Sequence, residues 1–132
     1  MTRPPHRCTP PWGTERGSAT LEMVVMLPIL FALLFGGLQA ALFHHARTLA
    51  IAAAQEGARA AAAEHGTLHA GVTAARAFAT QVGRDSLRDV TVTGQRTPTT
   101  ATITVTGASL TVVPGWDPHV TQTVTQQVER LS

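Results

Sequence analysis

Lysine and tyrosine are absent from this 132-residue chain, and charged residues of all kinds make up only 14% of it. A soluble globular domain usually has about 25% charged residues, so the share here is roughly half the usual one. All ten basic residues are arginine, they are scattered along the chain, and the net charge is only +2. A nucleic-acid interface needs a basic stripe. We therefore expect no nucleic-acid partner.

Cysteine occurs once, as Cys8, so no internal disulfide can form. The chain has no CxxC pair and no His/Cys spacing typical of zinc sites. His-Glu-x-x-His, a Gly-rich phosphate loop and a Ser/His/Asp spacing are missing as well. We therefore predict a protein that is not an enzyme and that has no catalytic residues, no metal and no cofactor.

The dominant feature is an apolar run from Met23 to Phe43, with the sequence MVVMLPILFALLFGGLQAALF and no formal charge. As a helix, this run would be about 31 Å long, close to the hydrocarbon thickness of a bilayer. A buried core helix of that length would show a polar face, whereas Gln39 is the only strongly polar residue here. The run predicts a single membrane-spanning helix over residues 18–43.

The charges that flank the run predict its orientation. Arg3, Arg7 and Arg16 precede it, whereas Arg47 is the near basic residue that follows. Arginine is retained on the cytoplasmic side of a membrane. We therefore predict a single-pass protein of the cytoplasmic membrane, with a cytoplasmic N-terminus and residues 44–132 exported.

Residues 44–83 are rich in alanine, which has the highest helix propensity. This composition predicts that the helix continues out of the membrane as an exported stem. Gly66 is expected to interrupt it, Thr67 to cap a second helical stretch, and Gly83 to end that stretch.

The exported region 84–132 changes to a period of two, which predicts a small antiparallel sheet that packs on the Ala-rich helix. The overall fold class is therefore α+β. The residues that predict strands are Val90 with Val92, Ile103 with Val105, Leu110 with Val112, and Val120 with Val124 and Val128. Turns are predicted at Gly94–Pro98, at Gly107 and at Val113–Gly115.

A carboxylate, that of Glu22, stands directly before the apolar run. An acidic residue costs about 2.5–3.5 kcal/mol at the centre of a membrane helix, and less near the interface. If the chain were cut after Gly17, the new α-amine of Ser18 would lie one helical turn from Glu22. Such a cut would supply a cation for the carboxylate, in the same chain or in a neighbouring one.

Gly17, followed by four residues, Glu22 and an apolar helix, resembles the class III signal of type IV pilins and pseudopilins. The finer resemblance, over residues 16–63, is to TadE-like pseudopilins of the tight-adherence (Tad/Flp) pilus. It is carried by Leu21-Glu22-Met23, by Pro28 six residues after the Glu, and by the segment Gln55–Ala61, QEGARAA. Met23 stands where the family usually has Phe, and Ser18 stands where the best-known pilins have Phe, which leaves N-methylation open.

The resemblance implies a pilin-like fold and a minor pseudopilin with a structural role in pilus assembly. A prepilin peptidase would remove the cytoplasmic leader, residues 1–17, and Ser18 would become the N-terminus. The expected partners are that peptidase, other pilins or pseudopilins, the assembly machinery and membrane lipid. Glu22 would neutralise an amine within the assembly.

Several further residues are candidates for shaping or packing the helix. Pro28 is the candidate for a kink within the membrane. The candidate packing positions are Gly36, Gly37, Ala40, Ala41, Glu56, Gly57 and Arg59. Plain membrane-helix composition accounts for the first four equally well.

The alternative is a signal-anchored or secreted binding module with no role in a pilus, which would use the loop around Trp116. Ordinary signal peptidase would then cut near Ala40 or Ala41, or not at all. The mature N-terminus distinguishes the two hypotheses.

Overall fold

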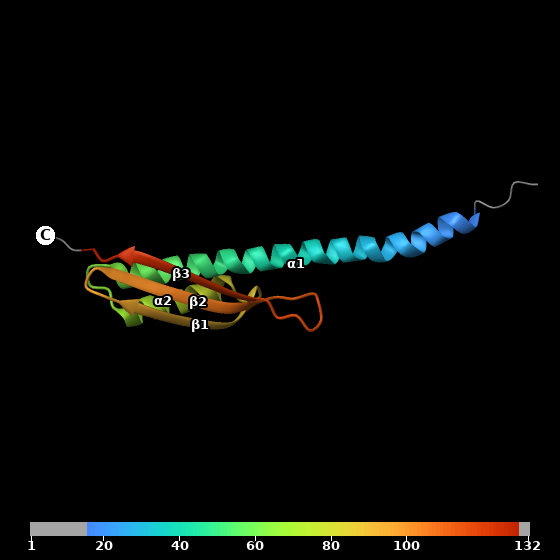
Figure 1. Cartoon of the computed structure of the whole chain (residues 1–132). Coiled ribbons are helices and arrows are strands. Elements are labelled where there is room, and N and C mark those ends of the chain that lie inside the picture. The colour runs from blue at the N-terminus through green and yellow to red at the C-terminus, as the bar shows by residue number, and fades with distance from the viewer. Residues whose placement is uncertain (1–15, 130–132) are drawn as a thin grey trace, which may run out of the picture. The chain divides into compact units, whose positions relative to one another are not determined.

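The computed structural model describes residues 16–129, with side chains from Thr20 onward. Two helices are followed by a three-stranded antiparallel sheet (Figure 1). This is the predicted α+β class with one long N-terminal apolar helix. Residues 1–15 of the predicted leader, with Cys8, lie outside the described residues. The chain separates into two compact units, one that ends at Leu34 and one that begins at Phe35.

Helix α1 is 47 residues long, Arg16–Ala62. Alanine and leucine dominate its sequence, and both have high helix propensity. Pro28 lies inside the helix, where its ring removes one backbone N–H donor to the carbonyl one turn earlier. The helix nevertheless continues through this position, so a single element contains the predicted span and the first part of the predicted stem.

Helix α2, Leu68–Val82, begins and ends where the sequence predicts. The Oγ1 of Thr67 accepts a hydrogen bond of 3.0 Å from the N–H of Ala70, which caps the N-terminus. At the other end the N–H of Gly83 donates to the carbonyl of Ala79 at 3.0 Å. These contacts confirm both predicted helix ends.

The sheet has the strand order β1-β2-β3, and both pairs are antiparallel. The strands are β1 Leu87–Arg96, β2 Thr100–Ser109 and β3 His119–Gln127. In β1 the register shifts between Arg88 and Thr91, and Asp89 lies there with a φ of 50°. This bulge interrupts the strand that the valine–threonine alternation predicts, without ending it.

The core of the second unit lies between the sheet and the two helices (Figure 1). Its largest fully buried side chains are Ile103 and Val105, both from β2. The helix α1 contributes alanines at helical spacing, namely Ala46, Ala50, Ala53, Ala54 and Ala58. Because these side chains are small, the helix backbone lies close to the sheet, and few large apolar residues are needed to fill the space.

The opposite face of the sheet is a threonine face. Its cross-strand rows are Thr91 with Thr106 and Thr121, Thr93 with Thr104 and Thr123, and Gln95 with Thr102 and Thr125. The hydroxyl groups of the β2 and β3 threonines pair across the strands at 2.9, 2.9 and 3.2 Å. The period-two pattern therefore separates an apolar face from a hydroxyl-bearing one.

Two of the predicted turns are wrong in whole or in part. Gly107 lies inside β2, opposite Val120, and a Cβ there would come within 2.8 Å of the Leu87 side chain. Gly107 therefore does not form a turn; its lack of a side chain makes room for the Leu87 side chain. Gly94 belongs to β1, and the turn begins after Arg96, where the N–H of Thr97 donates to the carbonyl of Thr100 at 2.8 Å.

The strand predicted from Leu110 and Val112 is also wrong. Strand β2 ends at Ser109, and both residues lie in the loop that connects it to β3. Their backbone groups bond to a side chain of α1 instead of to a neighbouring strand. The predicted turn at Val113–Gly115 is confirmed, because the N–H of Trp116 donates to the carbonyl of Val113 at 3.4 Å and Gly115 has a φ of +81°.

Candidate functional site: the N-terminal helix

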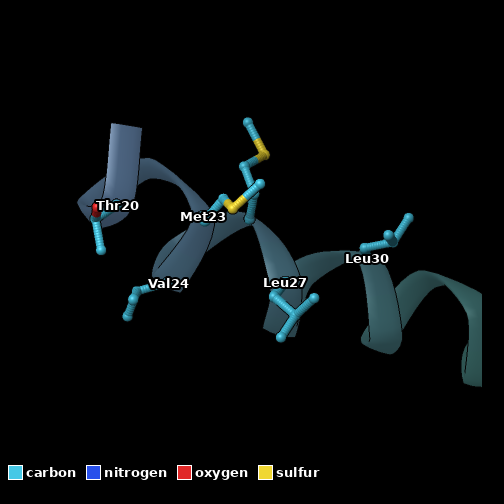
Figure 2. A pocket seen from close by; sticks show the side chains of 6 residues that line it. Thr20, Met23, Val24, Leu27 and Leu30 are labelled. Carbon is cyan, nitrogen blue, oxygen red and sulfur yellow. The ribbon is translucent and has the colours of Figure 1, made fainter. Parts of the chain in front are cut away.

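The part of α1 in the first unit presents its large apolar side chains to the surroundings. Their exposed fractions range from 48% for Phe31 to 76% for Met23. Figure 2 shows Thr20, Met23, Val24, Leu27 and Leu30 projecting outward from the helix. Among the described residues, α1 is the one helix long and apolar enough to cross a membrane. A surface of this kind suits lipid or neighbouring apolar helices.

The predicted processing residues Gly17 and Ser18 fall in the first turn of α1. Glu22 lies one turn after Ser18, and it is exposed. In the part of the chain whose side chains are described, no ion pair to Glu22 is formed. The carboxylate is therefore open to a charged group from outside that part, as the predicted pairing with an amine requires.

Gln39, the one strongly polar residue of the apolar run, is only 3% exposed. Its Nε2 donates to the carbonyl of Leu110 at 3.2 Å, and its Oε1 accepts from the N–H of Val112 at 2.9 Å. Both ends of the amide are thus paired with the backbone of the β2–β3 loop, an arrangement we call the Gln39 clamp. The sequence marks Gln39 as unusual, but it does not reveal these partners.

Gly57 lies where α1 crosses α2. A Cβ on Gly57 would come within 2.7 Å of the Gly71 carbonyl oxygen and of the Ala75 Cβ. A Cβ on Gly71 would in turn come within 2.7 Å of the Gly57 carbonyl oxygen and 2.6 Å of the Ala61 Cβ. The two helices therefore contact each other backbone to backbone, a glycine crossing that a larger residue on either side would obstruct.

The other candidate packing positions on α1 are open. A Cβ on Gly36 or Gly37 would have no neighbour within 4 Å, and Ala40 and Ala41 are exposed. This small-residue stripe, residues 36–41, therefore has room for the close approach of another helix.

Glu56 and Arg59 form an ion pair of 2.9 Å across one helical turn. The Arg59 side chain is 69% exposed to solvent, and that of Glu56 is 44% exposed. An exposed pair of this type contributes about 0–1 kcal/mol. The pair therefore adds little to the stability of α1.

Titratable side chains are dispersed over the described residues. In this part of the chain, no three His, Cys, Asp or Glu residues lie together in a way that could hold a metal ion. His44 and His45 are exposed just beyond the apolar run. The chemistry of α1 is thus that of an apolar surface with one carboxylate near its start and one buried amide near the end of the apolar run.

Comparison with known proteins identifies one segment. The family model described as TadE-like protein matches residues 17–59, all of which lie within α1. No curated protein and no solved structure matches the chain. The matched segment contains Gly17, Glu22, Pro28 and Gly57, so it includes all but the last two of the residues on which the predicted resemblance depends. Over residues 17–59 this chain is similar to TadE-like proteins, which confirms the predicted resemblance and supports a protein associated with a Tad pilus.

Proposed function

We propose that this protein is a minor pseudopilin-like structural component of a Tad-type pilus. The observation that carries the proposal is the TadE-like segment that begins at Gly17, in the first turn of a helix whose apolar side chains lie exposed. Glu22, at the start of that helix, is the one acidic residue beside the apolar run.

In this proposal a prepilin peptidase cuts after Gly17 on the cytoplasmic side, and residues 18–43 hold the mature chain in the membrane. The Ala-rich stem, residues 44–83, and the sheet region, residues 84–132, lie on the exported side. During assembly the exposed face of α1 exchanges lipid for neighbouring helices, since packing and polar pairing are what hold helices together in an apolar medium. Glu22 pairs with the α-amine of Ser18, in its own chain or in a neighbour.

The mature N-terminus, measured by intact mass on membrane-extracted protein, tests the processing step. We expect the chain to start at Ser18. We also expect Gly17→Leu to keep the leader attached, whereas Gly13→Leu, a matched change in the same segment, is cut normally. A start near Ala41, or an intact Met1, would contradict the proposal and favour the anchored or secreted binding module.

A further inference from the structure

The β2–β3 loop, residues 110–118, presents apolar side chains outside the core. Those that are exposed are Val112 at 38%, Val113 at 37% and Trp116 at 55%. The positive φ of Gly115 and the hydrogen bond between Trp116 and Val113 fold the loop into a compact tip. Asp117 is the one charged residue in the loop.

The Gln39 clamp fixes the position of this tip along α1. Both bonds of the Gln39 amide go to the loop backbone, and Figure 1 shows the loop, in orange, extending beside α1. A shallow apolar groove at this place is lined by Gly36, Ala40, Phe43, Val113, Trp116 and Pro118. The tip therefore lies beside the last two turns of the apolar run.

Those two turns are where the surroundings of α1 change. Exposed large apolar side chains continue as far as Leu38, and burial by the folded region begins at Gln39. The polar side chains of His44, His45 and Arg47 follow. For a helix that spans a membrane, such a change marks the boundary between hydrocarbon and water.

We infer that the 110–118 loop is a membrane-interface anchor, with Trp116, Val112 and Val113 in the headgroup region of the leaflet from which α1 emerges. The indole ring combines an apolar body with one N–H donor, and it is enriched at this boundary. Lipid is the occupant that the structure favours, because the exposed apolar tip lies against Gly36, Ala40 and Phe43, at the end of the apolar run. The inference rests on the membrane anchoring in the proposed function.

Tryptophan fluorescence of the full chain tests this inference. Trp12→Phe leaves Trp116 as the only tryptophan. The protein is reconstituted into phosphatidylethanolamine–phosphatidylglycerol vesicles, recovered by flotation, and quenched with lipids that carry a spin label near the headgroup or deep in the chain. We expect a blue-shifted emission, strong quenching by the shallow label, weaker quenching by the deep label and protection from aqueous acrylamide.

A matched control places the tryptophan at the other end of the sheet. Thr99→Trp, combined with Trp12→Phe and Trp116→Phe, puts the ring at an exposed site in the turn between β1 and β2. We expect this ring to emit as in water, to be quenched by acrylamide and to be untouched by either lipid label.

The remaining outcomes overturn the inference in distinguishable ways. If the chain floats with the vesicles but Trp116 behaves as the control does, the anchor is wrong and membrane anchoring stands. If Trp116 is protected from acrylamide and from both labels, and its emission depends on the protein-to-lipid ratio, the groove binds a second copy and not lipid. If the chain does not float, membrane anchoring and the proposed function fail together with the inference.

Discussion

Gln39 shows how one polar residue can be accommodated in an otherwise apolar run. An amide carries both a donor and an acceptor, and leaving either buried without a partner costs about 1–3 kcal/mol. Here the donor meets the Leu110 carbonyl and the acceptor meets the Val112 N–H. The pairing of β1 with β2 ends at Leu87 and Ser109, so the backbone of Leu110 and Val112 has no strand partner and bonds to this side chain instead.

Replacing Gln39 with leucine should loosen this loop. Gln39→Leu leaves the Leu110 carbonyl and the Val112 N–H without partners, so the loop swings toward water and avoids part of the penalty. We expect exchange of the Val112 amide hydrogen to accelerate by about 10- to 100-fold, the equivalent of about 1.4–2.8 kcal/mol. Gln81→Leu, at an exposed position of α2, should leave that exchange rate unchanged. Unaltered exchange in Gln39→Leu would show that the clamp does not hold the loop.

At the scale of elements, the glycine crossing explains the small residues of the TadE-like segment beyond the apolar run. Gly57 and Gly71 bring the backbones of α1 and α2 together, and Ala58 and Ala75 lie buried in the same core. The helix pair and the sheet then form two layers with few large side chains. Small residues at this place are thus required by the fold of a single chain, before any contact with a neighbouring subunit.

Adding a single methyl group should disturb the crossing. Gly57→Ala places a Cβ 2.7 Å from a backbone oxygen that the helix α2 holds in place. Overpacking of this type costs about 1–3 kcal/mol, whereas the gain in helix propensity is at most about 1 kcal/mol. We expect a net loss of about 1–2 kcal/mol in the free energy of unfolding, measured by denaturant titration in detergent.

Gly37→Ala is the matched control, since a Cβ there meets nothing within 4 Å. It should leave the free energy of unfolding unchanged or raise it slightly. Equal stability of Gly57→Ala and the parent chain would mean that the two helices separate easily, and that the crossing is not a close contact in solution.

The elements that sequence alone predicts are those whose signals are local. Alanine content, the Thr67 cap and Gly83 define α2, and valine–threonine alternation defines the three strands. The wrong predictions arise where the same residue type is compatible with two local structures. Gly107 is as compatible with a turn as with close packing against Leu87, and only the neighbouring strand decides between them.

The candidate site likewise contains some residues that a local sequence pattern marks and some contacts that it does not. Gly17, Glu22 and Pro28 follow one another along the chain, so a sequence pattern is enough to mark them. The Gln39 clamp joins residues 71 and 73 positions apart, and no local pattern encodes such a pairing. The glycine crossing is likewise a contact between two helices, and the small residue types reveal it only once the helices are placed.

The molecule as a whole combines an exposed apolar surface with a folded region whose apolar side chains are buried. The first unit, which ends at Leu34, exposes apolar side chains, whereas the second unit buries an alanine-rich core beneath a sheet with an outer threonine face. In the proposed function the first surface changes partners during assembly, and the second stays folded throughout. Glu22 belongs to the first surface, so in that proposal its role concerns incorporation and not folding.

Neutralising that carboxylate should therefore separate processing from assembly. Glu22→Gln keeps the side-chain shape and removes the charge that would pair with the Ser18 amine. We expect a mature mass that still starts at Ser18, together with a loss of about tenfold or more from the sheared pilus fraction. Glu64→Gln, a change in an exposed glutamate outside the TadE-like segment, should assemble normally. Normal incorporation of Glu22→Gln would exclude the proposed neutralising role.

The two halves of the Gln39 clamp are synthesised at different times. The ribosome adds about 5–20 residues per second, so Gln39 is made about 4–15 s before Leu110 and Val112 are available. Throughout that interval its amide must find other hydrogen-bond partners, which hydrocarbon does not provide but water and lipid headgroups do. In the proposed function, a newly inserted helix is therefore favoured to wait with Gln39 at the membrane surface until the loop that pairs with it has been made.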